Sequence, residues 1–302
     1  MQVTWLPDAE PRPRHVAVGE FDGVHLGHRE VMRGADTVLT FEPHPAAVVS
    51  PETAPKLLTS LETKADLIAE LGARELVVVP FDGAFARRSP QNFVDHVLVE
   101  RLGAERVSVG ENFRFGHRAE GDVALLRAQD AFETRVVELV QVAGEIVSST
   151  HIRALVEAGA MERAAAYLGS HFQLRGQVAH GDKRGRTLGF PTANLVPDPA
   201  LVHSGHGVYA SRAAVELDGA RRWWPAATNV GVRPTFVTGR GLLVEAFLIG
   251  FEGDLYGREL RLEFVDRLRG ELRFESVDEL VEQMQRDVED TRRIAAATGS
   301  AP

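Results

Sequence analysis

The sequence lacks cysteine and lacks any long apolar segment. None of its 302 residues is Cys, which excludes disulfides, thiolate zinc sites, iron–sulfur clusters and cysteine nucleophiles and fits a reducing compartment. No apolar run approaches the roughly 20 residues that a membrane-spanning helix needs. Residues 1–15 are charged and rich in proline and have no apolar stretch typical of a signal peptide. We therefore expect a soluble, cytoplasmic protein.

An excess of basic residues is also missing. The chain has 34 Lys and Arg against 43 Asp and Glu, for a formal net charge of −9. We therefore expect neither nucleic acid nor a membrane surface as a partner, although a local basic pocket is compatible with this balance. Hydrophobic residues make up 44% and charged residues 25%, as in folded globular proteins. At roughly 150 residues per domain, the length predicts two domains.

In the first half of the chain, strand signals alternate with helix signals. Thr59 and Glu62 have the spacing of a capping box, Ser89 precedes a proline at a helix start, and Ser149 is a third helix cap. Apolar, strand-like segments lie at 15–21, 37–41, 76–81, 106–110 and 134–140. This alternation predicts an α/β domain with a doubly wound parallel sheet over residues 1–170.

The pattern changes after Gly169. Strand-like segments now flank short turns that contain glycine, which is typical of β-hairpins. The pairs are 207–217 with 221–230 and 242–251 with 258–265. A single long helical pattern from about 276 to 296 ends the chain. We predict a small antiparallel β-barrel with a terminal helix over residues 171–302.

Residues 19–28, Gly-Glu-Phe-Asp-Gly-Val-His-Leu-Gly-His, follow the first strand and open a helix. Their three glycines let a ligand approach the backbone closely, and a helix start favours phosphate. His25 and His28 are three residues apart, so both face one side, where they can donate hydrogen bonds to a triphosphate. The alternative is a pair of packing histidines beside a glycine turn, which is common for so short a motif.

A second helix start also has phosphate-binding character. In residues 147–153, Val-Ser-Ser-Thr-His-Ile-Arg, the hydroxyls and Arg153 suit phosphate oxygens. An ordinary serine N-cap explains the same residues equally well. A parallel sheet can bring this start and the 19–28 turn to the carboxyl ends of its strands, where such folds bind ligands.

Residues 181–194, Gly-Asp-Lys-Arg-Gly-Arg-Thr-Leu-Gly-Phe-Pro-Thr-Ala-Asn, combine a basic glycine-rich loop with two oxygen ligands. Glycines and interspersed cations suit a loop that folds over phosphates, and a solvated basic turn is the alternative for residues 181–186. That alternative leaves Phe-Pro-Thr-Ala-Asn unexplained. The Thr192 hydroxyl and the Asn194 amide oxygen are hard ligands of the kind that Mg²⁺ takes beside phosphate and water.

Glu245 is an acidic residue in an apolar strand. Period-two geometry places it on the same face as Leu243, Phe247 and Ile249. A carboxylate in an apolar row is costly unless it is paired, and burial makes it a stronger base. These properties suit a general base beside a substrate hydroxyl. The alternative is a structural carboxylate, with its hydrogen bonds satisfied, near the mouth of the barrel.

The motifs of the first half resemble those of nucleotidyltransferases with HxGH and SSTxxR signatures, and more narrowly the adenylyltransferase half of bacterial bifunctional riboflavin kinase/FAD synthetases. The narrower match adds Thr-Phe-Glu-Pro-His-Pro (40–45) and Val-Gly-Glu-Asn-Phe-Arg-Phe-Gly (109–116). The resemblance implies a Rossmann-type sheet in which His25 and His28 act in catalysis and Asn112 faces the flavin. It also implies ATP contacts from Gly19, Phe21, Asp22, Gly27, Ser149, Thr150 and Arg153.

The second half resembles riboflavin kinases. The matching positions are Gly-Phe-Pro-Thr-Ala-Asn (189–194), Gly-Val-Arg-Pro-Thr (231–235), 207–209, Asn229, 254–257 and 267–274. The resemblance implies a six-stranded barrel with Glu245 as catalytic base and Thr192 and Asn194 as metal ligands. Arg269 is the implied flavin contact, with a charged helix-capping loop as the alternative. The implied ATP contacts are Gly181, Lys183, Arg186, Gly189 and Pro191.

The resemblance covers residues 15–295. It implies a bifunctional enzyme that phosphorylates riboflavin to FMN with ATP and Mg²⁺ and then adenylylates FMN to FAD, releasing pyrophosphate. We expect riboflavin, FMN, FAD and ATP as small-molecule partners, and a monomer or weak homo-oligomer. Only eleven residues separate His28 from Thr40, fewer than the family's helix and connection lead us to expect. The alternatives are a riboflavin kinase whose N-terminal domain has become a regulator, and a non-catalytic flavin- or nucleotide-binding module.

Overall fold

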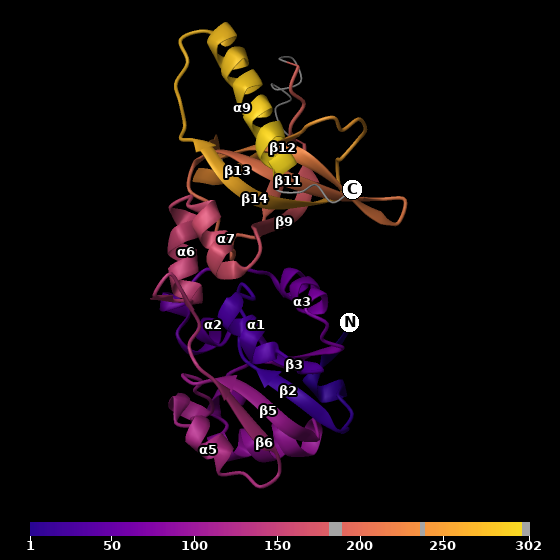
Figure 1. Ribbon diagram of the computed structural model, residues 1–302, viewed down its shortest axis with the longest axis vertical. Coiled ribbons are helices and arrows are strands. Elements are labelled where there is room, and N and C mark those ends of the chain that lie inside the picture. The colour runs from indigo at the N-terminus through magenta and orange to yellow at the C-terminus, as the bar shows by residue number, and fades with distance from the viewer. Residues whose placement is uncertain (181–188, 236–238, 298–302) are drawn as a thin grey trace. The chain divides into compact units, whose positions relative to one another are not determined.

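The chain forms two compact units, Met1–Ser149 and Thr150–Pro302 (Figure 1). The computed structural model describes residues 1–180, 189–235 and 239–297, without the side chains of residues 233–241. The second unit begins ahead of the predicted boundary at residue 170, because α7 (Met161–Leu168) packs on strands of the barrel. Where the two functions divide along the chain stays a prediction.

The first unit is built on a six-stranded sheet whose neighbouring strands all run parallel, as predicted. The spatial order is β1-β4-β3-β2-β5-β6. The bounds are β1 Gln2–Trp5, β2 Arg14–Val18, β3 Thr37–Glu42, β4 Glu75–Pro80, β5 Ala104–Gly110 and β6 Glu133–Val137. The edge strand β1 was not expected from the sequence pattern.

Short helices connect these strands. They are α1 Leu26–Met32, α2 Pro45–Val49, α3 Leu61–Glu70, α4 Pro90–Asn92 with a π-helical continuation over Phe93–Arg101, and α5 Val123–Arg127. Single 3₁₀ turns cover Leu6–Asp8, Pro51–Thr53, Phe85–Arg87 and His117–Ala119. A small hairpin pairs β7 Gln141–Val142 with β8 Glu145–Ile146.

The helix predicted to start at Thr59 begins one residue later. Ser60 is the N-cap of α3, and its Oγ accepts a hydrogen bond from the Thr63 N–H at 3.2 Å. Neighbouring hydroxyl residues look alike as caps in a sequence. Thr59 does not cap the helix, because its hydroxyl accepts a hydrogen bond from the Gly23 N–H in the turn after β2.

Both faces of the sheet are covered, which makes it doubly wound as predicted. One core holds Val16 and Val77 together with apolar residues of the helix over 93–101. The other core holds Ala17 and Leu76, each next in sequence to a residue of the first core, together with residues of α1 and α3. Successive strand residues point to opposite faces, so a sheet buried on both sides needs nearly continuous apolar strands.

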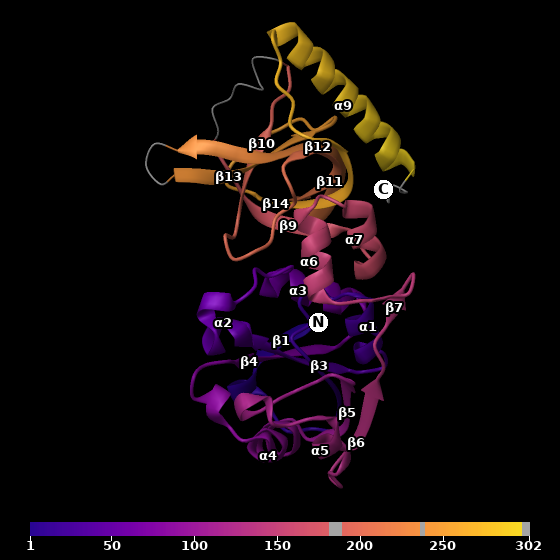
Figure 2. The same cartoon turned by 90° about the vertical axis from the view of Figure 1, so that its left-hand side faces the viewer.

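The second unit is a closed barrel of six antiparallel strands in the order β10-β13-β12-β11-β14-β9, which confirms the predicted barrel. The bounds are β9 Phe172–Ala179, β10 Ala193–Pro197, β11 Gly207–Leu217, β12 Ala220–Thr235, β13 Gly239–Leu248 and β14 Glu259–Arg269. Helix α6 (Ser149–Glu157) and α7 precede the barrel. The predicted terminal helix, α9 (Val277–Ala297), packs along β11, β12 and β14 (Figure 2).

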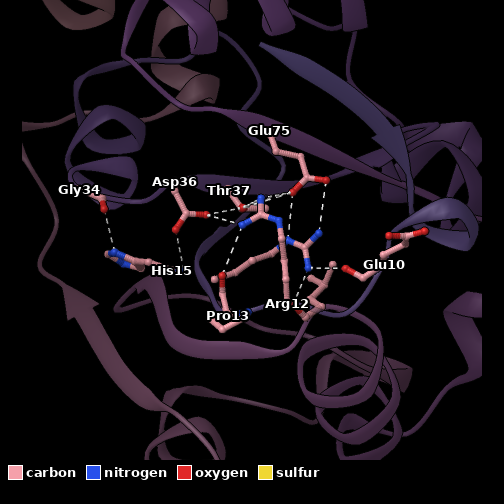
Figure 3. A network of polar contacts seen from close by, with 10 residues as sticks. Glu10, Arg12, Pro13, His15, Gly34, Asp36, Thr37 and Glu75 are labelled. Atoms are coloured by element: carbon pink, nitrogen blue, oxygen red, sulfur yellow. Dashed lines mark hydrogen bonds and ion pairs between the residues drawn. The ribbon is translucent and has the colours of Figure 1, made fainter.

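A polar network joins the amino ends of β2, β3 and β4 (Figure 3). The buried Glu75 carboxylate accepts hydrogen bonds from Nη2 of Arg12 at 2.7 Å and Nε of Arg14 at 3.0 Å. Beside it, Asp36 accepts the backbone N–H of His15 at 3.2 Å. Burial acts to raise the pKa of Glu75, but the hydrogen bond and charge of Arg14, together with Arg12, outweigh it and hold that pKa below its ordinary value.

We expect Glu75→Gln to destabilise the first unit by about 3 kcal/mol at neutral pH, because Arg14 loses the carboxylate that compensates its buried charge. The pKa of Glu75 is lower in the folded than in the unfolded chain. Its contribution is therefore present above the unfolded value, near pH 4.5, and is lost as the pH falls through the lower folded pKa. The difference between variant and parent chain should shrink in acid.

Urea unfolding followed by hydrogen exchange in peptides of β2, β3 and β4 measures this difference. Glu133→Gln is the matched control, because its exposed carboxylate pairs with Arg106 on the surface of the same sheet and such pairs contribute about 0–1 kcal/mol. An effect of Glu75→Gln that does not change between neutral and acid pH would contradict the assignment.

Candidate active sites

The carboxyl ends of β2 and β5 form the switch point of the parallel sheet. From β2 the next strands, β3 and β4, lie to one side, whereas β5 lies on the other, and ligands of such sheets bind at this reversal. Gly19 follows β2 and Gly110 ends β5, with Ala17 paired to Ser108. The turn that begins at Gly19 and the exposed Asn112 therefore lie at the same edge of the sheet.

The turn over residues 19–24 has an unusual backbone. Phe21, Gly23 and Val24 have φ angles of 52°, 85° and 45°, in the left-handed region that favours glycine. A Cβ atom at Gly19 would lie 2.9 Å from the Phe21 ring. The ring fills the space that Gly19 leaves, so these two predicted site residues define the shape of the turn together.

Asp22 fastens this turn to the rest of the unit. Its side chain is buried, and Oδ1 accepts the backbone N–H groups of Leu58 at 2.8 Å and Thr59 at 3.1 Å. The Thr59 hydroxyl accepts the N–H of Gly23 at 3.1 Å. Ser149 Oγ donates to the Asp22 carbonyl at 2.9 Å. The two predicted phosphate-binding segments therefore meet at Ser149, and the Asp22 carboxylate holds the turn in place.

The remaining residues of the second segment lie on α6. Thr150 and Arg153 are one helical turn apart, and Nη1 of Arg153 donates to Thr150 Oγ1 at 3.5 Å. The guanidinium group and the hydroxyl therefore lie together on one face of the helix.

His25 and His28 form a stacked pair at the start of α1. The Nδ1 atom of His25 accepts the N–H of His28 at 3.2 Å, and the ring centroids are 3.4 Å apart. Phe21 meets His28 edge to face at 5.4 Å. A Cβ at Gly27 would lie 3.2 Å from the His25 ring, so glycine leaves room for the stack.

His25 is the more buried residue of the two as a whole, and His28 is half-buried. The Nδ1 atom of His28 is shielded from solvent and has no hydrogen-bond partner in the part of the chain that the structure describes. Burial, followed by the nearby His25 and Lys64, lowers the pKa of His28 well below its ordinary value. The imidazole is therefore uncharged at neutral pH and presents neutral hydrogen-bonding nitrogens.

Lys64 is a candidate that sequence reasoning missed. It lies on α3 with 5% of its surface exposed, and its Nζ donates to the Glu20 carbonyl at 2.8 Å and to Thr40 Oγ1 at 3.3 Å. The signal was present in the sequence, because Lys64 stands three and four residues before Leu67 and Ile68, on the apolar face of the helix. Lysine is rarely buried there unless it has partners.

On the barrel, strand register aligns three polar residues. Asn194 of β10 is opposite Glu245 of β13, and Glu245 is opposite Asn229 of β12. Directly opposed residues of antiparallel strands project from the same face, and all three are half-buried. We call Asn194, Glu245 and Asn229 the polar row. It brings together a predicted base, a predicted metal ligand and an amide that the family resemblance pointed to.

Glu245 shares its face of β13 with Leu243 and Phe247, as the sequence predicts, and all three are half-buried. The fully buried face of β13 carries Val244 and Ala246, whereas Glu245 lies on the opposite face, half-buried. Apolar residues occur on both faces of β13, so alternation alone does not show which face fills the barrel. The two amides across the strands make this face polar at Glu245.

The segment before β10 runs beside β13. The Phe190 ring contacts the Phe247 ring at a centroid distance of 5.3 Å, and half-buried Thr192 follows between Phe190 and the polar row. Gly189 and Pro191 are exposed at the start of this segment. The predicted phosphate-loop residues Gly181, Lys183 and Arg186 lie outside the described residues.

Arg269, the predicted flavin contact, ends β14 and is held by α9. Its Nε and Nη2 atoms donate to Oδ1 and Oδ2 of the buried Asp287 at 3.1 and 2.8 Å. Its guanidinium also lies 5.9 Å from the centre of the Phe274 ring. Two residues after Arg269, an oxygen of the Glu271 side chain lies 2.7 Å from the position that a Cβ atom of Gly231 would occupy. The segment after β14 therefore folds closely over β12, which is possible because residue 231 is glycine.

The donor set of the barrel site fits a hard cation better than zinc. Thr192, Asn194 and Glu245 offer a hydroxyl, an amide and a carboxylate oxygen, the ligand types that Mg²⁺ takes. Within residues 1–180, 189–235 and 239–297, no group of three or more His, Asp or Glu side chains is arranged to hold a metal ion. Among the same residues, no helix is both long and apolar enough to cross a membrane.

Comparisons with known proteins match both halves of the chain. Residues 8–151 match the FAD synthetase family and residues 168–295 match the riboflavin kinase family. A bifunctional riboflavin kinase/FMN adenylyltransferase of Listeria monocytogenes is 37% identical over 93% of this chain and 92% of its own length. The proteins of that name from Escherichia coli and Bacillus subtilis are 37% and 34% identical, over 90% and 92% of this chain and 90% and 91% of their own.

One solved structure is similar over almost the whole chain. A protein from Streptococcus pneumoniae, described as a macrolide-efflux protein, has a TM-score of 0.85 and 28% identity, and the match covers 97% of this chain and 99% of that one. Its description names a transport function, whereas both family matches and the curated relatives name flavin-nucleotide chemistry. The solved structure and this chain therefore share a fold, and the two sets of descriptions differ in the function that they name.

We expect Gly19→Ala to loosen the turn over residues 19–24, because the new methyl group would collide with the Phe21 ring and push it away from His28. Overpacking of this kind costs about 1–3 kcal/mol. Hydrogen exchange in peptides that cover residues 19–32 should become faster. Gly83→Ala is the control, because its methyl group would meet only the end of the Arg87 side chain, at 3.4 Å. Equal exchange in both variants would contradict this account of the turn.

Proposed function

We propose that the two candidate sites perform the two reactions of the family to which this chain belongs, the bifunctional riboflavin kinases/FMN adenylyltransferases. The chain phosphorylates riboflavin to FMN and adenylylates FMN to FAD, and each step consumes ATP. The matches to both halves do not favour the alternative of a kinase with a degenerate N-terminal domain. A cytoplasmic location and a monomeric or weakly associated state are part of the proposal.

The polar row carries the kinase assignment. The Glu245 carboxylate takes the proton from the ribityl 5′-hydroxyl of riboflavin as that oxygen attacks the γ-phosphorus of ATP. A new O–P bond forms, the bond to the β,γ-bridging oxygen breaks, and ADP leaves. The carboxylate is half-buried between Asn194 and Asn229, which orients it. Orientation matters because phosphoryl transfer depends mainly on positioning and charge stabilisation.

Thr192 and Asn194 are the proposed holders of Mg²⁺, which supplies positive charge against the phosphates of ATP when it is bound. Their oxygen atoms fit that ion, and Asn194 is opposite the proposed base. The proposed ATP-contacting residues of the same domain are Gly181, Lys183, Arg186, Gly189 and Pro191. Arg269 is the proposed flavin contact, and its bidentate bond to Asp287 fixes the orientation of its guanidinium.

The turn after β2 carries the adenylyltransferase assignment. A phosphate oxygen of FMN attacks the α-phosphorus of ATP, an O–P bond forms, and pyrophosphate leaves, so no protein nucleophile is required. The neutral His28 and its partner His25 stabilise the developing charge, and Asn112 faces the flavin. The proposed ATP contacts are Gly19, Phe21, Asp22, Gly27, Ser149, Thr150 and Arg153, with Asp22 acting through the shape of the turn.

We expect Glu245→Gln to abolish FMN formation, a loss on the order of a hundredfold or more for a missing general base. The variant should still convert supplied FMN to FAD. Purified chain is incubated with riboflavin or FMN, ATP and Mg²⁺, and the flavins are separated by chromatography over time. Glu252→Gln, in the exposed turn after β13, is the control. Retained kinase activity in Glu245→Gln would overturn the base assignment.

His28→Ala should have the opposite effect. FMN should still appear from riboflavin but accumulate, because removal of a charge-stabilising donor typically costs about a hundredfold or more in rate. The same chromatographic time course measures both products. Undiminished FAD synthesis would remove His28 from the site, and a parallel loss of kinase activity would show a general folding defect.

A further inference from the structure

Lys64 is buried next to the proposed adenylyltransferase site, and the mechanism above makes no use of it. Only 5% of its surface is exposed, and desolvation is the main cause that lowers its pKa from the ordinary value. Burying an ammonium group is unfavourable unless hydrogen bonds and opposite charges replace its hydration. Its neighbours on the same helix, Leu67 and Ile68, belong to the apolar core, so the polar partners of Lys64 come from other segments.

The hydrogen bonds of Lys64 converge on the turn after β2. Its Nζ donates to the Glu20 carbonyl at 2.8 Å and to Thr40 Oγ1 at 3.3 Å. Thr40 Oγ1 donates to the same carbonyl at 3.0 Å. The ammonium group thereby links α3, β3 and the turn through one backbone oxygen. The next residue along the chain is Phe21, whose ring contacts His28.

Lys64 also contributes charge. The groups that face it are the carboxylates of Asp22, Glu42 and Glu20, which act against the effect of its burial. Among the described residues, the charged or titratable groups that act on His28 are His25, on its own helix end, and Lys64 from α3. Lys64 is therefore a cationic side chain that acts on His28 from a separate helix.

We propose that Lys64 is a positioning residue of the adenylyltransferase site, where it holds the Glu20 carbonyl and supplies a fixed positive charge beside His28. This inference rests on the proposed function of the first unit. The two effects act together: the turn keeps Phe21 against His28, and the charge opposes protonation of His28. An uncharged imidazole at neutral pH is the form that the site then presents to ATP.

The test compares Lys64→Met, which removes the charge, with Lys64→Arg, which keeps it. In Lys64→Met the kcat of FMN adenylylation should fall on the order of tenfold, with a smaller change in KM. The acid limb of its pH profile should move up by about one pH unit, because His28 protonates more readily without the neighbouring cation. Lys64→Arg should keep the acid limb of the parent chain and recover part of the rate.

Titration of the His28 Cε1 proton by NMR in the full chain, with His28→Ala for assignment, gives a readout independent of activity. The expected result is a higher pKa of His28 in Lys64→Met and no change in Lys64→Arg. Riboflavin kinase activity and hydrogen exchange in α3 and β3 verify that each variant is folded.

The outcomes separate the inference from its premise. If both Lys64 variants lose rate equally while the acid limb and the His28 titration stay unchanged, Lys64 is structural only and the inference is overturned. Parent-like behaviour of Lys64→Met overturns it as well. If instead His28→Ala retains FAD synthesis, the adenylyltransferase site itself is misassigned, whatever Lys64 does.

Discussion

Backbone groups that leave a sheet must find other hydrogen-bond partners, and the first unit depends on how this is done after β2. At its start the Gly19 N–H still donates to the Leu39 carbonyl of β3 at 3.2 Å, and beyond that point side chains from distant segments supply hydrogen-bond partners to the turn over residues 19–24. Lys64 and Thr40 bond to the Glu20 carbonyl, Thr59 bonds to the Gly23 N–H, and Ser149 bonds to the Asp22 carbonyl. These bonds hold a backbone that is otherwise disfavoured. The position of the histidine pair follows from the turn.

In the barrel, backbone groups find their hydrogen-bond partners in a different way. Its closed ladder pairs each strand with two neighbours, so backbone groups are satisfied within the sheet and side chains are free for chemistry. The polar row consists of residues from three strands, of which β12 and β13 are consecutive and β10 lies earlier in the chain. Rigid strands place such residues more accurately than loops do. One unit thus uses side chains to fix a turn, and the other uses strand register to fix side chains.

Much of the fold was predictable from the sequence, because it depends on local periodicity. Alternating strand and helix signals predicted the parallel sheet, and hairpin turns predicted the barrel. Contacts between distant segments were not predictable in this way. Thr59 has the signature of a cap but bonds to Gly23, and Arg269 is tied to Asp287. Lys64 could have been noticed on an apolar helix face, but its partners appear only once β3 and the turn are placed.

The candidate site residues were predicted mainly from motifs, which do not give the surroundings of each side chain. Glu245 was identified, but alternation in β13 could not show that Val244 and Ala246 face the interior, since apolar residues occupy both faces. Asn229 becomes important through its register with Glu245. The face of a strand and its partner are properties of the assembled barrel.

The alignment of the polar row has a consequence for folding errors in the barrel. A slip of β13 by a single residue would exchange its two faces. Glu245 would enter the packed interior, and Val244 or Ala246 would take its place between the two asparagines. Misaligned barrels, even compact ones, would therefore lack a carboxylate between the two asparagines. With Glu245 as the proposed base, kinase activity of this unit would at the same time report correct strand register.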